Sequence, residues 1–170
     1  MNQHKYYPAL VSAFAAAVLT TIPGIKSFAC CLLVPAASVL ALYLDQKFNK
    51  SEVNISSNKA MITGIITGIL IALFSSSLEI FITFILKSNE LTQTLPELEV
   101  LLSQMELGTV SEDIINMLRN ISAEINESGF SIQFTFFLFT SNIITDAIFG
   151  FLGGLLGMAI LNKQNNNKDL

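Results

Sequence analysis

Two acidic residues, Glu79 and Asp146, lie within the two longest apolar stretches of this sequence. A carboxylate inside a membrane costs several kcal/mol, so such a residue is by default a candidate for binding or proton transfer. Ser76 and Asn142 each precede one of these acids by about one helical turn. We expect the four residues to form an intramembrane acidic cluster that binds a cation or shares a proton, because two close carboxylates resist ionising together.

A second interpretation places both acids near the outer boundary of the membrane. Counted from Ala60 and Leu161, Glu79 lies about 28 Å and Asp146 about 22 Å along its helix, at a rise of about 1.5 Å per residue. Carboxylates at that depth can be reached by water or hydrogen-bonded by neighbouring hydroxyl groups. The sequence leaves both interpretations open.

The sequence contains none of the common motifs of enzymes or metal sites. It has no His-Glu-x-x-His, no Gly-x-Ser-x-Gly and no phosphate-binding glycine loop, and its single histidine is His4. Cys30 and Cys31 are adjacent, without a Cys-x-x-Cys spacing or a histidine partner. We therefore expect no enzymatic activity, no metal and no cofactor. The two cysteines are small apolar residues of a helix, or else a lipidated or surface thiol.

The composition indicates a membrane protein. Of the 170 residues, 52% are hydrophobic and 13% are charged, whereas soluble domains carry roughly 25% charged residues. The nine Lys and Arg residues form no basic cluster, which argues against nucleic-acid binding. Four stretches reach the roughly 17 apolar residues that a membrane crossing requires: Ala9 to Ile25, Phe28 to Leu44, Ala60 to Leu86 and Phe130 to Leu161.

We predict an all-α polytopic membrane protein with four transmembrane helices arranged as two hairpins. Residues 1–50 form the first hairpin, and residues 51–170 form the second, which includes an extracytoplasmic helical insert at 89–129. The first two spans are at the lower length limit, so a re-entrant pair that does not cross fully is the alternative for this segment.

The distribution of basic residues predicts the orientation. Positive charge is held on the cytoplasmic side of a membrane, so both termini are expected there and the acidic insert is expected outside. This arrangement places six basic residues on the cytoplasmic side: Lys5, Lys47, Lys50, Lys59, Lys163 and Lys168. It places three on the other side: Lys26, Lys87 and Arg119.

The insert is predicted to be an amphipathic helical hairpin. Its first helix should begin at the capping box Thr94-Leu95-Pro96-Glu97 and end near Gly108. Its second helix should begin at Ser111-Glu112-Asp113 and end at Gly129. The apolar stripe of this second helix consists of Ile114, Leu118, Ile121 and Ile125. The hairpin is either a structural cap on the membrane helices or, through residues 94–127, a docking surface for a protein partner.

Small residues recur at four-residue spacing in the third and fourth spans. Such residues let helix backbones approach closely in lipid, where no hydrophobic force drives helices together. We expect the two spans to touch along these faces, either within one chain or between two copies in a homo-oligomer. The residues are Gly64, Gly68, Gly150, Gly153, Gly154 and Gly157.

The layout resembles a broad family of uncharacterised bacterial four-span membrane proteins, a domain of unknown function. The resemblance is carried by Ile55-Ser56-Ser57-Asn58-Lys59-Ala60-Met61-Ile62-Thr63-Gly64, by the acidic insert, and by the closing apolar helix that ends in Asn162-Lys163-Gln164. It covers the second half of the chain well and the first half loosely. The family implies a location in the bacterial inner membrane and brings no established activity.

From these features we expect a non-enzymatic integral inner-membrane protein that acts as a helical scaffold or accessory subunit. Its contact surface would be the acidic extracytoplasmic hairpin, and its partners would be the lipid bilayer and another protein. The alternative is a small transporter or ion-conducting protein that uses Glu79 and Asp146.

Overall fold

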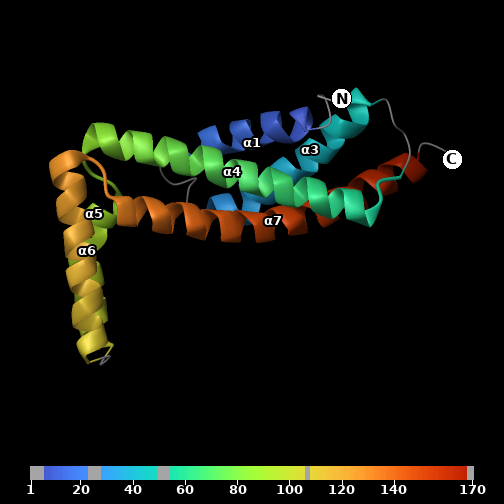
Figure 1. Ribbon diagram of the computed structural model, residues 1–170. Coiled ribbons are helices and arrows are strands. Elements are labelled where there is room, and N and C mark those ends of the chain that lie inside the picture. The colour runs from blue at the N-terminus through green and yellow to red at the C-terminus, as the bar shows by residue number, and fades with distance from the viewer. Residues whose placement is uncertain (1–5, 23–27, 50–53, 106–107, 168–170) are drawn as a thin grey trace. The chain divides into compact units, whose positions relative to one another are not determined.

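The computed structural model describes residues 6–22, 28–49, 54–105 and 108–167, and every element in these ranges is a helix (Figure 1). The all-α prediction is therefore confirmed. The elements are α1 (Tyr7–Thr20), the π-helix η1 (Ala29–Leu33), α3 (Val34–Phe48), α4 (Ser57–Leu86), α5 (Glu90–Gln104), α6 (Thr109–Ser128) and α7 (Ile132–Asn166).

The chain divides into two compact units, and α4 and α7 contribute to both. Unit 1 comprises Met1–Leu78 and Phe139–Leu170, and unit 2 comprises Glu79–Leu138. Both boundaries fall inside long helices, whereas the sequence places a boundary between residues 50 and 51.

Among the described residues, three helical segments are long and apolar enough to cross a membrane: Cys30–Phe48, Ser57–Leu86 and Ile132–Asn166. Helix α1 has 14 residues and is therefore about 21 Å long, which is less than the roughly 30 Å of a bilayer's hydrocarbon core. The expected first span, Ala9 to Ile25, is too long, because the helix ends at Thr20. Residues 23–27 lie outside the described part, and four crossings in two hairpins stay a prediction.

Side-chain hydroxyl groups satisfy the carbonyl oxygens at the end of α1. The Thr20 hydroxyl donates to the carbonyl oxygen of Ala17 at 2.6 Å, and the Thr21 hydroxyl donates to that of Val18 at 2.7 Å. The last carbonyl groups of a helix otherwise need water or a cap. The carbonyl oxygens of Ala17 and Val18 therefore have side-chain partners within the helix end itself.

Helices α1 and α3 pack antiparallel in unit 1. The ring of Tyr7, at the start of α1, meets that of Phe48, at the end of α3, with 6.3 Å between centroids. Nearer the other ends of the two helices, alanines of α1 pack with Val34 of α3. Helix α1 also touches α4, because Phe14 meets Phe74 edge to face at 5.6 Å.

Helices α4 and α7 cross antiparallel with their backbones in contact. A Cβ atom at Gly64 would overlap the carbonyl oxygen of Gly150, and one at Gly68 would overlap that of Asp146. A Cβ atom at Gly154 would likewise overlap the carbonyl oxygen of Ala60. The contacts advance by four residues along α4 as they step back by four along α7. Glycine is therefore required here because no side chain fits between the helices.

Helices α3 and α7 run parallel in the same unit. A Cβ atom at Gly153 would overlap the backbone of Pro35, and one at Gly157 would lie 3.1 Å from Cα of Val39. Both contacts advance by four residues in the same direction. Two faces of α7 thus use glycine, one against α4 and one against α3.

Helix α5 begins earlier than the sequence predicts. Its N-cap is Asn89, whose side chain accepts a hydrogen bond from the Thr92 N–H at 3.0 Å, while the Asn89 N–H donates to the Thr92 hydroxyl at 3.0 Å. The predicted start at Thr94 is wrong, because its hydroxyl bonds to the carbonyl oxygen of Glu90 at 2.8 Å inside the helix. The reciprocal Asn89–Thr92 pair satisfies the helix start before Pro96 is reached.

The glycines that flank α6 act at opposite ends of that helix. Gly108 is its N-cap with φ of 60°, so the prediction that Gly108 ends the preceding helix is wrong, and α5 already ends at Gln104. Helix α6 therefore begins at Thr109, two residues before the predicted start. Gly129 ends it in a left-handed conformation with φ of 78°, as predicted, and its N–H donates to the carbonyl oxygen of Ile125 at 2.8 Å.

Candidate functional site

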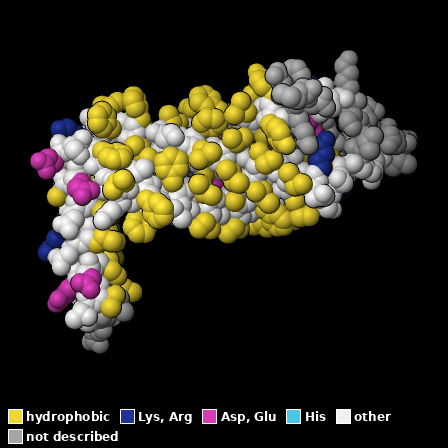
Figure 2. Space-filling model, viewed as in Figure 1, with side chains coloured by type: hydrophobic (Ala, Val, Ile, Leu, Met, Phe, Trp, Pro, Cys, Tyr) yellow, Lys and Arg dark blue, Asp and Glu magenta, His cyan; other side chains and the backbone are white. Residues whose placement is uncertain are grey.

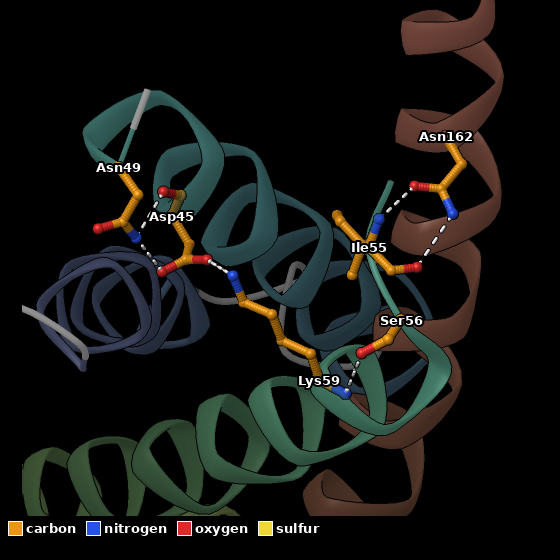
Figure 3. A network of polar contacts seen from close by, with 6 residues as sticks. All are labelled: Asp45, Asn49, Ile55, Ser56, Lys59 and Asn162. Atoms are coloured by element: carbon orange, nitrogen blue, oxygen red, sulfur yellow. Dashed lines mark hydrogen bonds and ion pairs between the residues drawn. The ribbon is translucent and has the colours of Figure 1, made fainter. Parts of the chain in front are cut away.

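A polar network surrounds Asp45 at one end of unit 1 (Figure 3). Asp45 lies in the last turn of α3 with its side chain 8% exposed, and Nζ of Lys59 lies 2.5 Å from its Oδ2. Nδ2 of Asn49 donates to Oδ1 of Asp45 at 2.9 Å and to its carbonyl oxygen at 3.0 Å. Oδ2 has no hydrogen bond of good angular geometry within the described residues. The Lys59 ammonium, although close, therefore acts on it mainly by charge.

The side chain of Asn162 fixes the connection between α3 and α4 to the end of α7. It accepts a hydrogen bond from the Ile55 N–H at 2.7 Å and donates one to the Ile55 carbonyl oxygen at 3.0 Å. The Ile55 side chain packs in a small core with Leu42, Ala60 and Leu161. Three helix ends are thus held together by polar and apolar contacts at the same place.

This network is a clamp that the sequence analysis did not identify. Asp45 is the single acid of the apolar segment Cys30–Phe48, so the argument that singles out Asp146 applies to it as well. Asn162 carries no comparable signal, since its partner is a backbone segment 107 residues away. The residues at this end of unit 1 include Lys47, Lys59 and Lys163, in the last turn of α3, at the start of α4 and in the last turn of α7.

Three residues of the predicted acidic cluster, Ser76, Asn142 and Asp146, lie in unit 1. Nδ2 of Asn142 on α7 donates to the hydroxyl of Ser76 on α4 at 2.9 Å, and Ser76 is fully buried. Asp146 lies one turn further along α7 and is 9% exposed. Its carbonyl oxygen faces Gly68. The structure thus brings together Ser76 and Asn142, and it buries Asp146 beside them at the glycine crossing.

The fourth member of the predicted cluster belongs to unit 2. Glu79 is the first residue of that unit and is half-buried. The pairing of Glu79 with Asp146 therefore stays a prediction. The described residues contain no group of three or more His, Cys, Asp or Glu side chains arranged to hold a metal ion.

The hairpin of α5 and α6 in unit 2 carries an apolar surface. No residue of α5 is buried, and Val100, Leu101 and Met105 are 55%, 58% and 61% exposed. Val110 at the start of α6 is 54% exposed. Figure 2 shows hydrophobic side chains along one side of this hairpin and acidic side chains on the other.

One ion pair ties the two helices of the hairpin together. Nε and Nη2 of Arg119 on α6 donate to the two carboxylate oxygens of Glu99 on α5 at 2.7 and 2.8 Å. These hydrogen bonds, with the positive charge of Arg119, lower the pKa of Glu99. The same hydrogen bonds, with the negative charge of Glu99, raise the pKa of Arg119. This two-point geometry is specific to a guanidinium group.

Cys30 and Cys31 are free thiols at the start of the segment Cys30–Phe48, with 3.6 Å between their sulfur atoms. Cys31 is exposed, which leaves a lipidated or surface thiol as an open interpretation.

Comparison of the chain with protein-family models, with curated proteins and with solved structures finds no match. The resemblance to a four-span bacterial family therefore stays a prediction.

Proposed function

We propose that this protein is an integral membrane scaffold or accessory subunit that binds a protein partner through the α5–α6 hairpin. The observation that carries the proposal is the exposed apolar face of α5, where Val100, Leu101 and Met105 are more than half exposed. The helices of unit 1 would anchor the chain in the bilayer, because three segments have the length and hydropathy for crossing.

The chemistry of the α5 face indicates the kind of partner. Glu97 lies three residues before Val100 and four before Leu101, and Leu101 lies four before Met105, so these side chains share one exposed face of the helix. Glu97 and Glu90 are exposed, and α5 contains no Lys or Arg. The complementary surface is an apolar patch flanked by basic side chains, since matched charges at the rim of an interface favour the correct partner.

The outer face of α6 has a different composition. Glu112, Asp113, Asn116, Asn120 and Glu124 are all exposed on it. A polar face of this kind is stable in contact with water and needs no protein partner to bury it. We therefore assign partner binding to α5 and exposure to water to α6.

Site-specific photo-cross-linking in native membranes tests this assignment. A photoreactive residue at position 101 should capture one protein in stoichiometric yield, and Met105→Glu in the same chain should abolish that product. The matched control is a photoreactive residue at position 120 on α6, which should capture no partner. Equal yields at the two positions, or a product at 101 that consists of lipid, would contradict the proposal.

A second candidate function, transport or conduction of an ion, is favoured by the burial of Asp146 in α7. An ionisable group that is buried within a membrane span is a common element of ion and proton pathways. The full-length protein in liposomes would then carry a proton or cation flux. Replacing Asp146 or Glu79 by its amide should abolish this flux, and an unchanged flux would exclude the transport function.

A further inference from the structure

Asp146 is a buried carboxyl group without a compensating partner in its own unit. The residue is 9% exposed, and within the described residues no side chain donates a hydrogen bond to its carboxyl group or forms an ion pair with it. Asp45, the other buried acid of unit 1, has Lys59 and Asn49 as partners. The two acids therefore have opposite electrostatic surroundings.

The residues that surround Asp146 offer no countercharge. Gly68 lies opposite on α4, with Ala72 one turn further, and Asn142 and Gly150 occupy the adjacent turns of α7. The Asn142 amide group already donates to Ser76. Along α4 and α7 within unit 1, the ionisable side chains other than Asp146 are Lys59, in the first turn of α4, and Lys163, in the last turn of α7.

An ionised carboxylate in such surroundings is costly, and a proton removes that cost. Burying an unpaired charge in an apolar medium is far less favourable than burying a neutral hydrogen-bonding group. The crossing is also tight, because a Cβ atom does not fit at Gly68. A proton adds no volume to this contact, whereas a metal ion needs several oxygen ligands around it.

We propose that Asp146 is a proton-binding site at the α4–α7 crossing and is occupied by a proton while the two helices are packed together. Release of the proton requires access to water, which the burial of Asp146 at the crossing limits. Proton release and loosening of the crossing are therefore linked equilibria, each favouring the other. This site lies in unit 1, whereas the proposed partner surface lies in unit 2.

Infrared spectroscopy of the full-length protein in lipid nanodiscs tests the site directly. At pH 5 the protein should show the carbonyl-stretch band of a protonated carboxylic acid, and the band should shift when the solvent is D2O. Asp146→Asn should remove the band, whereas Glu79→Gln should keep it. Asp146→Glu, which retains a carboxyl group, should move the band without abolishing it. This variant keeps the test valid if the amide variant folds poorly.

A second measurement follows thermal stability against pH in sodium-free buffer with choline as the cation. Stability of the wild type should fall as pH rises, because loss of the proton leaves an unpaired charge at the crossing. Asp146→Asn should remove this dependence, since the amide resembles the protonated acid. The absence of the infrared band in the folded wild type, or its persistence in Asp146→Asn, would overturn the proposal. Stabilisation by sodium that disappears in Asp146→Asn would assign the site to a metal cation and overturn it as well.

Discussion

The side-chain amide of Asn162 pairs with both backbone groups of Ile55, accepting from its N–H at 2.7 Å and donating to its carbonyl oxygen at 3.0 Å. One side chain thus replaces the two hydrogen bonds that a neighbouring strand would supply. Ile55 is 6% exposed, so water has little access to these groups when the amide is removed.

Replacement of Asn162 by Leu should therefore destabilise the protein. The leucine is similar in size but leaves a backbone donor and acceptor unpaired, at about 1–3 kcal/mol for each buried group. Thermal unfolding in mild detergent measures the effect. The control is Asn166→Leu, which removes only a 3.3 Å hydrogen bond between exposed side chains. Equal losses for the two variants would show that the clamp contributes nothing.

Gly64→Ala should destabilise the protein although alanine is the better helix former. In an unconstrained helix this change stabilises by about 1 kcal/mol, but here the added methyl group meets the carbonyl oxygen of Gly150. Overpacking of this kind costs about 1–3 kcal/mol. Ile62→Ala is the control, because Ile62 is 49% exposed. A stabilising effect of Gly64→Ala in thermal unfolding would disprove the close crossing.

The Glu99–Arg119 pair should stabilise the hairpin in a pH-dependent manner. Hydrogen bonding to Arg119 lowers the pKa of Glu99 in the folded state. Its contribution is therefore present above the ordinary glutamate pKa of about 4.3 and is lost as pH falls through the lower folded value. NMR titration of the Glu99 carboxyl carbon measures the shift. Arg119→Lys should reduce it, since lysine cannot form the two-point contact, and an unchanged titration would contradict the pairing.

The predicted orientation can be tested by cysteine labelling. In a Cys30→Ala, Cys31→Ala background, a membrane-impermeant reagent should label Ser103→Cys on intact cells and should label Ser57→Cys only after permeabilisation. Both positions are exposed, so accessibility within the protein does not limit the reaction. The expectation rests on the lysines at the start of α4 and in the last turns of α3 and α7. The reverse pattern would invert the orientation.

The sequence predicts the long helices well because each is specified by its own composition. Helices α4 and α7 coincide with the two longest apolar stretches, and the end of α6 follows from the conformational freedom of Gly129. The start of α5 is predicted less well because two capping boxes compete within six residues. Asn89 precedes Thr94 and Pro96, and it caps the helix first.

The candidate sites differ in the same way, because some depend on local sequence and others on contacts between distant segments. Asp146 is identifiable from the sequence because an acid in an apolar run is conspicuous in itself. The pairing of Asn162 with Ile55 and that of Lys59 with Asp45 arise only when segments distant in the chain meet. Polar contacts between such segments have no local pattern from which they can be predicted.

The hydrogen bonds of Thr20 and Thr21 at the end of α1 affect which segments of the chain must cross the bilayer during insertion. The Thr20 and Thr21 hydroxyl groups bond the carbonyl oxygens of Ala17 and Val18, and the Ile22 N–H bonds that of Leu19. These bonds lower the cost of ending the helix within hydrocarbon, in which case the following segment with Lys26 would not be exported. Because α1 and α3 are antiparallel, Tyr7 and Phe48 lie on the same side whether the pair crosses or returns. The translocation machinery would then have one stretch to move across the bilayer, the stretch between α4 and α7.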